Sequence, residues 1–98
     1  MPGRSDIPPA FFDRADAVIA LANRQVGDGQ SPGDVSASTL YAAARFNAFA
    51  SAVAHRSAAG LAADRAEVLD YFTAQYRAML GEHLDDCIAH FERYAPAS

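Results

Sequence analysis

Residues 64–94 read DRAEVLDYFTAQYRAMLGEHLDDCIAHFERY, and this stretch decides the fold class. Its apolar residues recur at steps of three and four, which is the period of an α-helix. The stripe consists of Leu69, Phe72, Tyr76, Met79, Leu80, Leu84, Cys87, Ile88, Phe91 and Tyr94. It predicts a helix of about thirty residues and about 45 Å, which ends before Pro96 and overhangs a compact domain of this size. Either the helix bends at Gly81, or another chain covers its far end.

Two further segments with the same period predict two more helices. The segment 9–26 begins at the second proline of the pair Pro8-Pro9, which suits the first turn of a helix. The next stretch, 27–34, holds three glycines and a proline and predicts a turn. A second helix is expected over residues 36–57, with Ser36 or Ser38 as its N-cap.

The third helix has its own start signal, because Asp64 is followed three residues later by Glu67 in the pattern of a capping box. No strand pattern or internal repeat interrupts the three helical segments. Both connections are short, so neighbouring helices are expected to be antiparallel. The sequence therefore predicts an all-α protein, a three-helix up-down-up bundle with a long C-terminal helix in a single helical domain over 1–98. Residues 1–8 and 95–98 are expected to be irregular or disordered.

Composition indicates a folded protein and disfavours two classes of partner. Apolar residues make up 51% of the chain and charged residues 20%, with a formal net charge of -4. All basic residues are arginines scattered singly among acids, which argues against nucleic acid and anionic membranes. The apolar run 40–44 is far shorter than the roughly 20 residues of a membrane span. With Cys87 as the one cysteine, a cytoplasmic location is expected.

Several stretches resemble a known family. They are FFDRAD at 11–16, YAAARFNAF at 41–49 and QYRAML at 75–80. The chain resembles the small, uncharacterised proteobacterial proteins grouped as domain-of-unknown-function family 3144. The resemblance implies a cytoplasmic bacterial protein, and it brings no activity, cofactor or catalytic residue. The family pattern usually has Asn and Tyr where this chain has His83 and Cys87, so the resemblance does not support chemistry at those two side chains.

One candidate site is a metal site on the third helix. His83, Cys87 and His90 are spaced by four and three residues, which places them on one helical face, and imidazole with thiolate suits zinc. Glu82 or Asp86 could add an oxygen ligand. The same three residues lie on the apolar stripe, where a cysteine usually behaves as a small hydrophobe, so packing is the favoured interpretation.

A second candidate site consists of Tyr41, Arg45, Asn47 and Tyr76. Polar side chains that interrupt an apolar helix need partners. Arg45 could hold a carboxylate or phosphate of a small molecule in a pocket between helices, through its two-pronged donor geometry. The alternative is an internal network, for instance of Arg45 with Asp13 or Asp16, that fixes the register of the helices. We favour the internal network.

These patterns predict a non-enzymatic interaction or structural module. It is expected to self-associate, as a homodimer, or to bind an unknown protein partner. The alternative is a helical protein that binds a small molecule, such as an anion, or a metal. The chain shows no nucleophile motif and no phosphate-binding loop, so neither a catalytic residue nor a cofactor is predicted.

Overall fold

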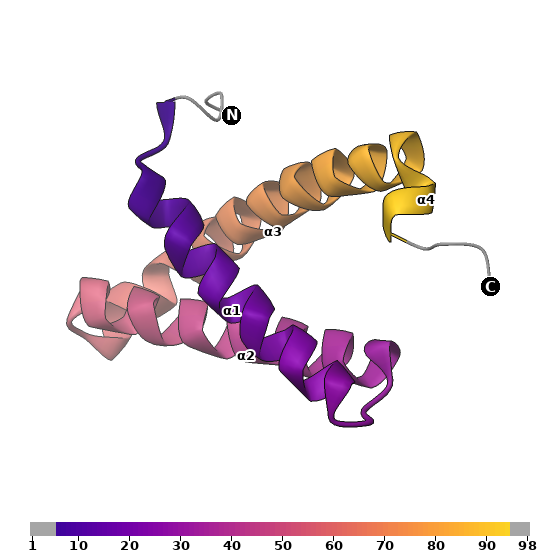
Figure 1. Cartoon of the computed structure of the whole chain (residues 1–98). Coiled ribbons are helices and arrows are strands. Elements are labelled where there is room, and N and C mark those ends of the chain that lie inside the picture. The colour runs from indigo at the N-terminus through magenta and orange to yellow at the C-terminus, as the bar shows by residue number, and fades with distance from the viewer. Residues whose placement is uncertain (1–5, 95–98) are drawn as a thin grey trace. The chain divides into compact units, whose positions relative to one another are not determined.

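The computed structural model describes residues 6–94, and all of their regular structure is helical (Figure 1). The helices are α1 (Pro9–Gly27), α2 (Pro32–His55), α3 (Ala58–Ala89) and α4 (Phe91–Tyr94). The predicted all-α class with a long C-terminal helix is confirmed. Residues 6–8 lie outside any α-helix, as predicted. The prediction of irregular ends also covers 1–5 and 95–98, which lie outside the described residues.

The chain divides into two compact units, Met1–Ala54 and His55–Ser98. The first unit contains α1 and nearly all of α2, and the second contains α3 and α4. The predictions of a single domain over 1–98 and of an up-down-up bundle stay predictions.

The start and end of α1 follow from proline and glycine. Pro8 precedes the helix with φ -57° and ψ 141°, and Pro9 occupies the first helical position, where the missing N–H has no intrahelical partner to lose. After the helix, the backbone N–H of Asp28 donates to the carbonyl oxygen of Arg24 at 3.0 Å. Gly29 then turns the chain at φ 94°, a conformation that favours glycine. The predicted helix over 9–26 is thus confirmed to within one residue.

α2 begins earlier than predicted, at Pro32 instead of residue 36. The hydroxyl of Ser31 accepts a hydrogen bond from the backbone N–H of Asp34 at 3.1 Å, so Ser31 caps the helix. The prediction of Ser36 or Ser38 as the cap is wrong, since both residues lie inside the helix. A proline directly after a serine is a helix start signal, and here it overrides the glycines around it.

α3 also begins earlier, at Ala58 instead of residue 64. Ser57 has an extended backbone, and its hydroxyl accepts a hydrogen bond from the N–H of Gly60 at 3.0 Å. The predicted Asp64 cap is wrong: Asp64 lies inside the helix, where its carboxylate contacts Nε2 of His55 at 3.0 Å. This contact joins the last residue of α2 to the early turns of α3 across the short link.

The end of α3 corrects a further boundary. The helix continues through Gly81 to Ala89, so this glycine does not end it. His90 then leaves the helical conformation with φ -126° and ψ 40°, and α4 forms a single turn beyond it (Figure 1). The prediction of one unbroken helix over 64–94 is therefore wrong at both ends. The structure has a helix of 32 residues, about 48 Å long, followed by the separate single-turn helix α4.

The link between α2 and α3 predicts a stabilising substitution. Arg56 has φ 62°, the left-handed conformation that costs a residue with a side chain roughly 1 kcal/mol. We expect Arg56→Gly to raise the free energy of unfolding by about 0.5–1 kcal/mol. Urea unfolding followed by circular dichroism measures the change. Arg65→Gly, inside α3, is the control and should lower stability by about 1 kcal/mol; a destabilising Arg56→Gly would contradict this account.

Among the described residues, Val35 is the one buried apolar side chain, at 6% exposure. Ala22 and Val26 near the end of α1 and Thr39 on α2 are half-buried, as are Phe12, Asn47 and Ser51 farther from the turn that joins the two helices. Farther from this turn, Phe46, Phe49 and Val53 of α2 are exposed. The apolar surface of the helices is therefore far larger than the part that the chain buries.

Candidate functional site

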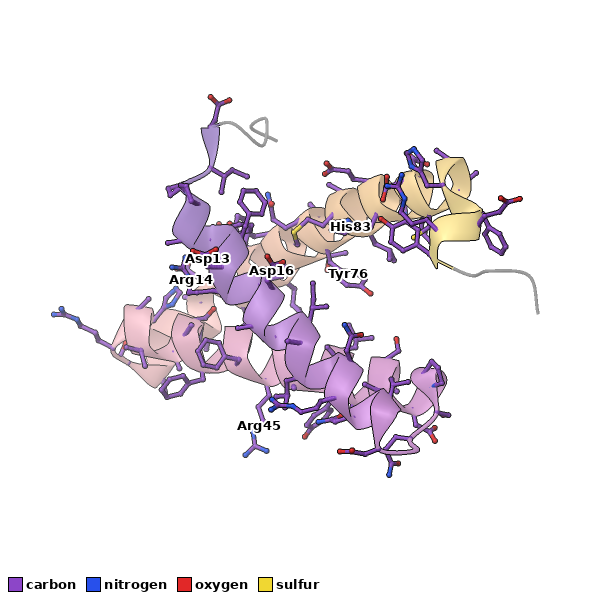
Figure 2. The ribbon with its side chains drawn as sticks, in the orientation of Figure 1. Asp13, Arg14, Asp16, Arg45, Tyr76 and His83 are labelled. Carbon is purple, nitrogen blue, oxygen red and sulfur yellow. The ribbon has the colours of Figure 1, made fainter. Side chains whose placement is uncertain are left out.

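The residues of the predicted anion site do not all share one face of α2. Tyr41 and Arg45 are one turn apart, lie on the same side and are both exposed. Asn47 lies two residues further, about 200° around the helix, and is half-buried. Arg45 points away from α1, which carries Asp13 and Asp16 (Figure 2). The structure therefore does not bring Arg45 to either aspartate, and the pairs that we offered as an example of an internal network do not form.

The fourth residue of this set belongs to the other unit. Tyr76 lies on α3 and is half-exposed (Figure 2). Its place beside Arg45 stays a prediction. What the structure shows is an exposed Tyr41–Arg45 pair on one helix, which offers guanidinium N–H groups and a phenol to an anion in water. Such open pairs bind weakly, because solvent competes for each donor.

The predicted metal ligands lie at the end of α3. His83 is exposed and Cys87, one turn later, is half-buried. His90 follows the last residue of the helix, and its Nδ1 atom lies 3.1 Å from a carboxylate oxygen of Asp86. Within residues 6–94, no three or more His, Cys, Asp or Glu side chains are grouped so that they could hold a metal ion. The zinc site thus stays a prediction, without support from the geometry.

A cluster that the sequence analysis missed joins α4 to α3. Asp86 accepts a hydrogen bond from the hydroxyl of Tyr94 at 2.5 Å through one carboxylate oxygen and contacts His90 through the other. The hydrogen bonds from Tyr94 and His90 lower the pKa of Asp86. The same bond raises the pKa of Tyr94, because the phenol proton is held by the carboxylate. The steps of four from Asp86 to His90 to Tyr94 were visible in the sequence, but the turn that closes the cluster was not.

This cluster predicts a limited pH range for the α3–α4 contact. The pKa of Asp86 is lowered, so the contact is complete above its ordinary value of 3.8 and is lost as pH falls through the lowered value. The pKa of Tyr94 is raised, so the contact is complete below 10.0 and is lost as pH rises through the raised value. We expect Tyr94→Phe to move the pKa of Asp86 upward, as measured by carbon NMR of the carboxylate. Tyr71→Phe, elsewhere on α3, should leave it unchanged, and an equal shift in both variants would contradict the assignment.

No helix in the part of the chain that the structure describes is both long enough and apolar enough to cross a membrane.

Comparison with protein families identifies the chain at the level of its family. The model described as Protein of unknown function (DUF3144) matches residues 11–88. The chain belongs to the DUF3144 family. This match covers most of α1, all of α2 and nearly all of α3, and it ends before His90 and α4. No curated protein and no solved structure matches the chain.

The DUF3144 match bears on the candidate sites only through its extent. Tyr41, Arg45, Asn47 and Tyr76 lie within it, as do His83 and Cys87. The family description assigns no activity, so it gives none of these side chains a role. A functional proposal for a DUF3144 protein must therefore come from the surfaces of the molecule itself.

Proposed function

We propose that the chain is a non-enzymatic interaction module that self-associates as a homodimer through apolar helix faces. The observation that supports this proposal is the exposure of the apolar stripe on α3. Leu80 is 41% exposed, Leu84 51% and Ile88 74%, on a helix whose period would place them in a core. Leu69 and Tyr76 continue the stripe toward the start of the helix and are also half-exposed.

The free energy of such exposure is large for a chain of this size. Burying one leucine or isoleucine side chain stabilises a protein by about 1.5–3 kcal/mol relative to leaving it in water. A small domain has a net stability of only about 5–15 kcal/mol, so several exposed side chains of this kind matter. Helices in proteins gain most of their stability from packing of their apolar face. The described part of the unit His55–Ser98, residues 55–94, contains one long helix and one short turn, so within it no second long helix covers the stripe.

A second copy of the chain is well suited to cover this stripe. Identical chains present the same apolar face to each other, and two-fold pairing is the commonest form of soluble oligomer. The charges of α3 also permit it. Glu82 and Asp86 lie on the side of the helix opposite Leu84, since they are displaced from it by about 160°. Two apolar faces can therefore meet without bringing these carboxylates together.

Multi-angle light scattering after size exclusion tests the proposal on the full chain. At about 10–200 µM, the range in which small interfaces associate, we expect twice the chain mass of 10.4 kDa. The mass should not fall in about 1 M salt, because screening weakens ionic contacts and leaves apolar contacts intact. A mass of one chain at every concentration would contradict self-association.

A further inference from the structure

The chain leaves α3 at a single residue, His90, which separates this helix from α4. His90 has φ -126° and ψ 40°, whereas helical residues have about -63° and -42°. Its backbone N–H still donates to the carbonyl oxygen of Asp86 at 2.9 Å, and α4 begins at the next residue (Figure 1). The observed break therefore depends mainly on the backbone angles of this one residue.

The residue types around the break do not forbid a continued helix. Helices commonly end at a glycine in the left-handed conformation, but no residue of α3 or α4, which the structure describes throughout, has a positive φ. After Gly81, the next glycine or proline is Pro96. The apolar spacing also continues, because Phe91 would lie about 20° from Leu84 around an unbroken helix. The end of α3 at Ala89 thus needs a cause other than a helix-breaking residue.

A hydrogen bond joins α4 to α3, from the hydroxyl of Tyr94 to a carboxylate oxygen of Asp86 at 2.5 Å. In an unbroken helix the two residues would be about 12 Å apart along the axis, and the Asp86 side chain would point away from Tyr94, toward the helix N-terminus. This bond therefore forms only when the chain has turned at His90. The contact of Asp86 with His90 joins residues four apart and is compatible with both arrangements.

We propose that the hydrogen bond between Tyr94 and Asp86 is a latch that selects between two ends of α3. With the bond formed, the helix ends at Ala89 and α4 is a separate turn. With the bond broken, residues 90–94 continue α3 by about 7.5 Å and bring Phe91 onto its apolar stripe. The latch thus sets the length of this stripe. It goes beyond the proposed self-association and does not depend on it.

The two ends of α3 are expected to be close in free energy. The Asp86 side chain is 47% exposed, so water competes for its carboxylate and limits the strength of the latch. Against this, a charged acceptor strengthens the bond from Tyr94. A continued helix would supply N–H donors to the last carbonyl groups of α3, which have no partner inside the helix. Loss of either side chain of the latch should therefore shift the balance toward the continued helix.

Tyr94→Phe tests the latch on the full chain, because it removes the hydroxyl and keeps the ring. The Cα and carbonyl carbon NMR shifts of residues 90–94 report their helical population whether the chain is a monomer or a dimer. We expect the ratio of the continued to the turned state to rise about three- to tenfold, as for the loss of one hydrogen bond. Tyr71→Phe changes another exposed tyrosine of α3 and is the matched control, which should leave these shifts unchanged.

Two results with Tyr94→Phe would overturn the latch. Unchanged shifts would show that the hydrogen bond does not hold the turn. Shifts typical of an irregular chain at residues 90–94 would show that the helix does not continue when the bond is lost. An equal increase in helix with Tyr71→Phe would also overturn it, because that variant leaves the bond to Asp86 in place.

Asp86→Ala tests the latch from its other partner, and the same increase in helix at residues 90–94 is expected. Asp85→Ala is its matched control, since it also removes a negative charge near the helix C-terminus and also introduces a strong helix former. Because the latch is one bond, the double variant Asp86→Ala/Tyr94→Phe should exceed the stronger single variant by no more than about twofold. Effects that multiply in the double variant, or an equal effect of Asp85→Ala, would overturn the proposal.

Discussion

Replacement of Ile88 by aspartate is expected to dissociate the proposed dimer while leaving the helices in place. The proposed dimer would bury this side chain in the apolar stripe of α3, and an unpaired carboxylate in an apolar contact costs several kcal/mol. The substitution occurs twice in each dimer. We therefore expect the dissociation constant to rise at least about a hundredfold, which corresponds to about 2.7 kcal/mol. Light scattering measures the mass, and circular dichroism shows whether the helices remain.

Ala89→Asp is the matched control for this experiment. It introduces the same charge at the neighbouring position of α3, with the same unfavourable proximity to the helix C-terminus. Residue 89 lies about 140° around the helix from Leu84 of the apolar stripe, and its side chain is exposed. We expect Ala89→Asp to remain dimeric. Equal dissociation in both variants would show that the added charge acts through the helix end and not through the apolar stripe of α3.

Helix starts were predictable where a single signal acted and were missed where two signals competed. The pair Pro8-Pro9 predicts the start of α1, and the glycines after the helix, including Gly29, predict the turn that follows it. At α2, the glycines indicated a turn while Pro32 indicated a helix start, and the proline prevailed. At α3, Gly60 weakened the helical pattern, although Ser57 three residues earlier caps the helix with its hydroxyl.

The end of α3 illustrates a limit of periodicity. Phe91 and Tyr94 continue the apolar spacing of the helix, so the pattern contains no stop before Pro96. The backbone nevertheless leaves the helix at His90, and α4 follows as a separate turn. No glycine or proline marks this break. It coincides with the hydrogen bond from Tyr94 to Asp86, a contact between residues eight apart that forms only once the chain has turned.

The candidate anion site shows what residue type can indicate and what it cannot. Arg45 and Asn47 are polar residues within an otherwise apolar helix. Helix geometry alone separates them, because two residues correspond to more than half a turn. Pairing with Tyr76 is a different matter, since it depends on how two units of the chain are arranged. Periodicity defines the faces of each helix, but it does not specify which faces meet.

Replacement of Val35 by aspartate is expected to destabilise the unit Met1–Ala54 strongly. Val35 is the buried apolar side chain of the first turn of α2, beside the turn that joins this helix to α1. A carboxylate there would be desolvated, because the position is only 6% exposed. We expect a loss of about 3 kcal/mol or more in the free energy of unfolding, measured in urea.

Val53→Asp makes the same chemical change on the same helix at a side chain that is 60% exposed. This control should lose less than about 1 kcal/mol, because the carboxylate at residue 53 stays hydrated. The two losses therefore separate burial within the unit from burial elsewhere. An equal loss of stability at Val53 would mean that the outer face of α2 is also covered in solution. Val35 would then not be more buried than Val53 in solution. Repeating the Val53→Asp measurement in the Ile88→Asp background, which is expected to be monomeric, shows which chain covers the outer face of α2. If the loss of stability persists in that background, the same chain covers Val53. If the loss disappears, the second copy covers it.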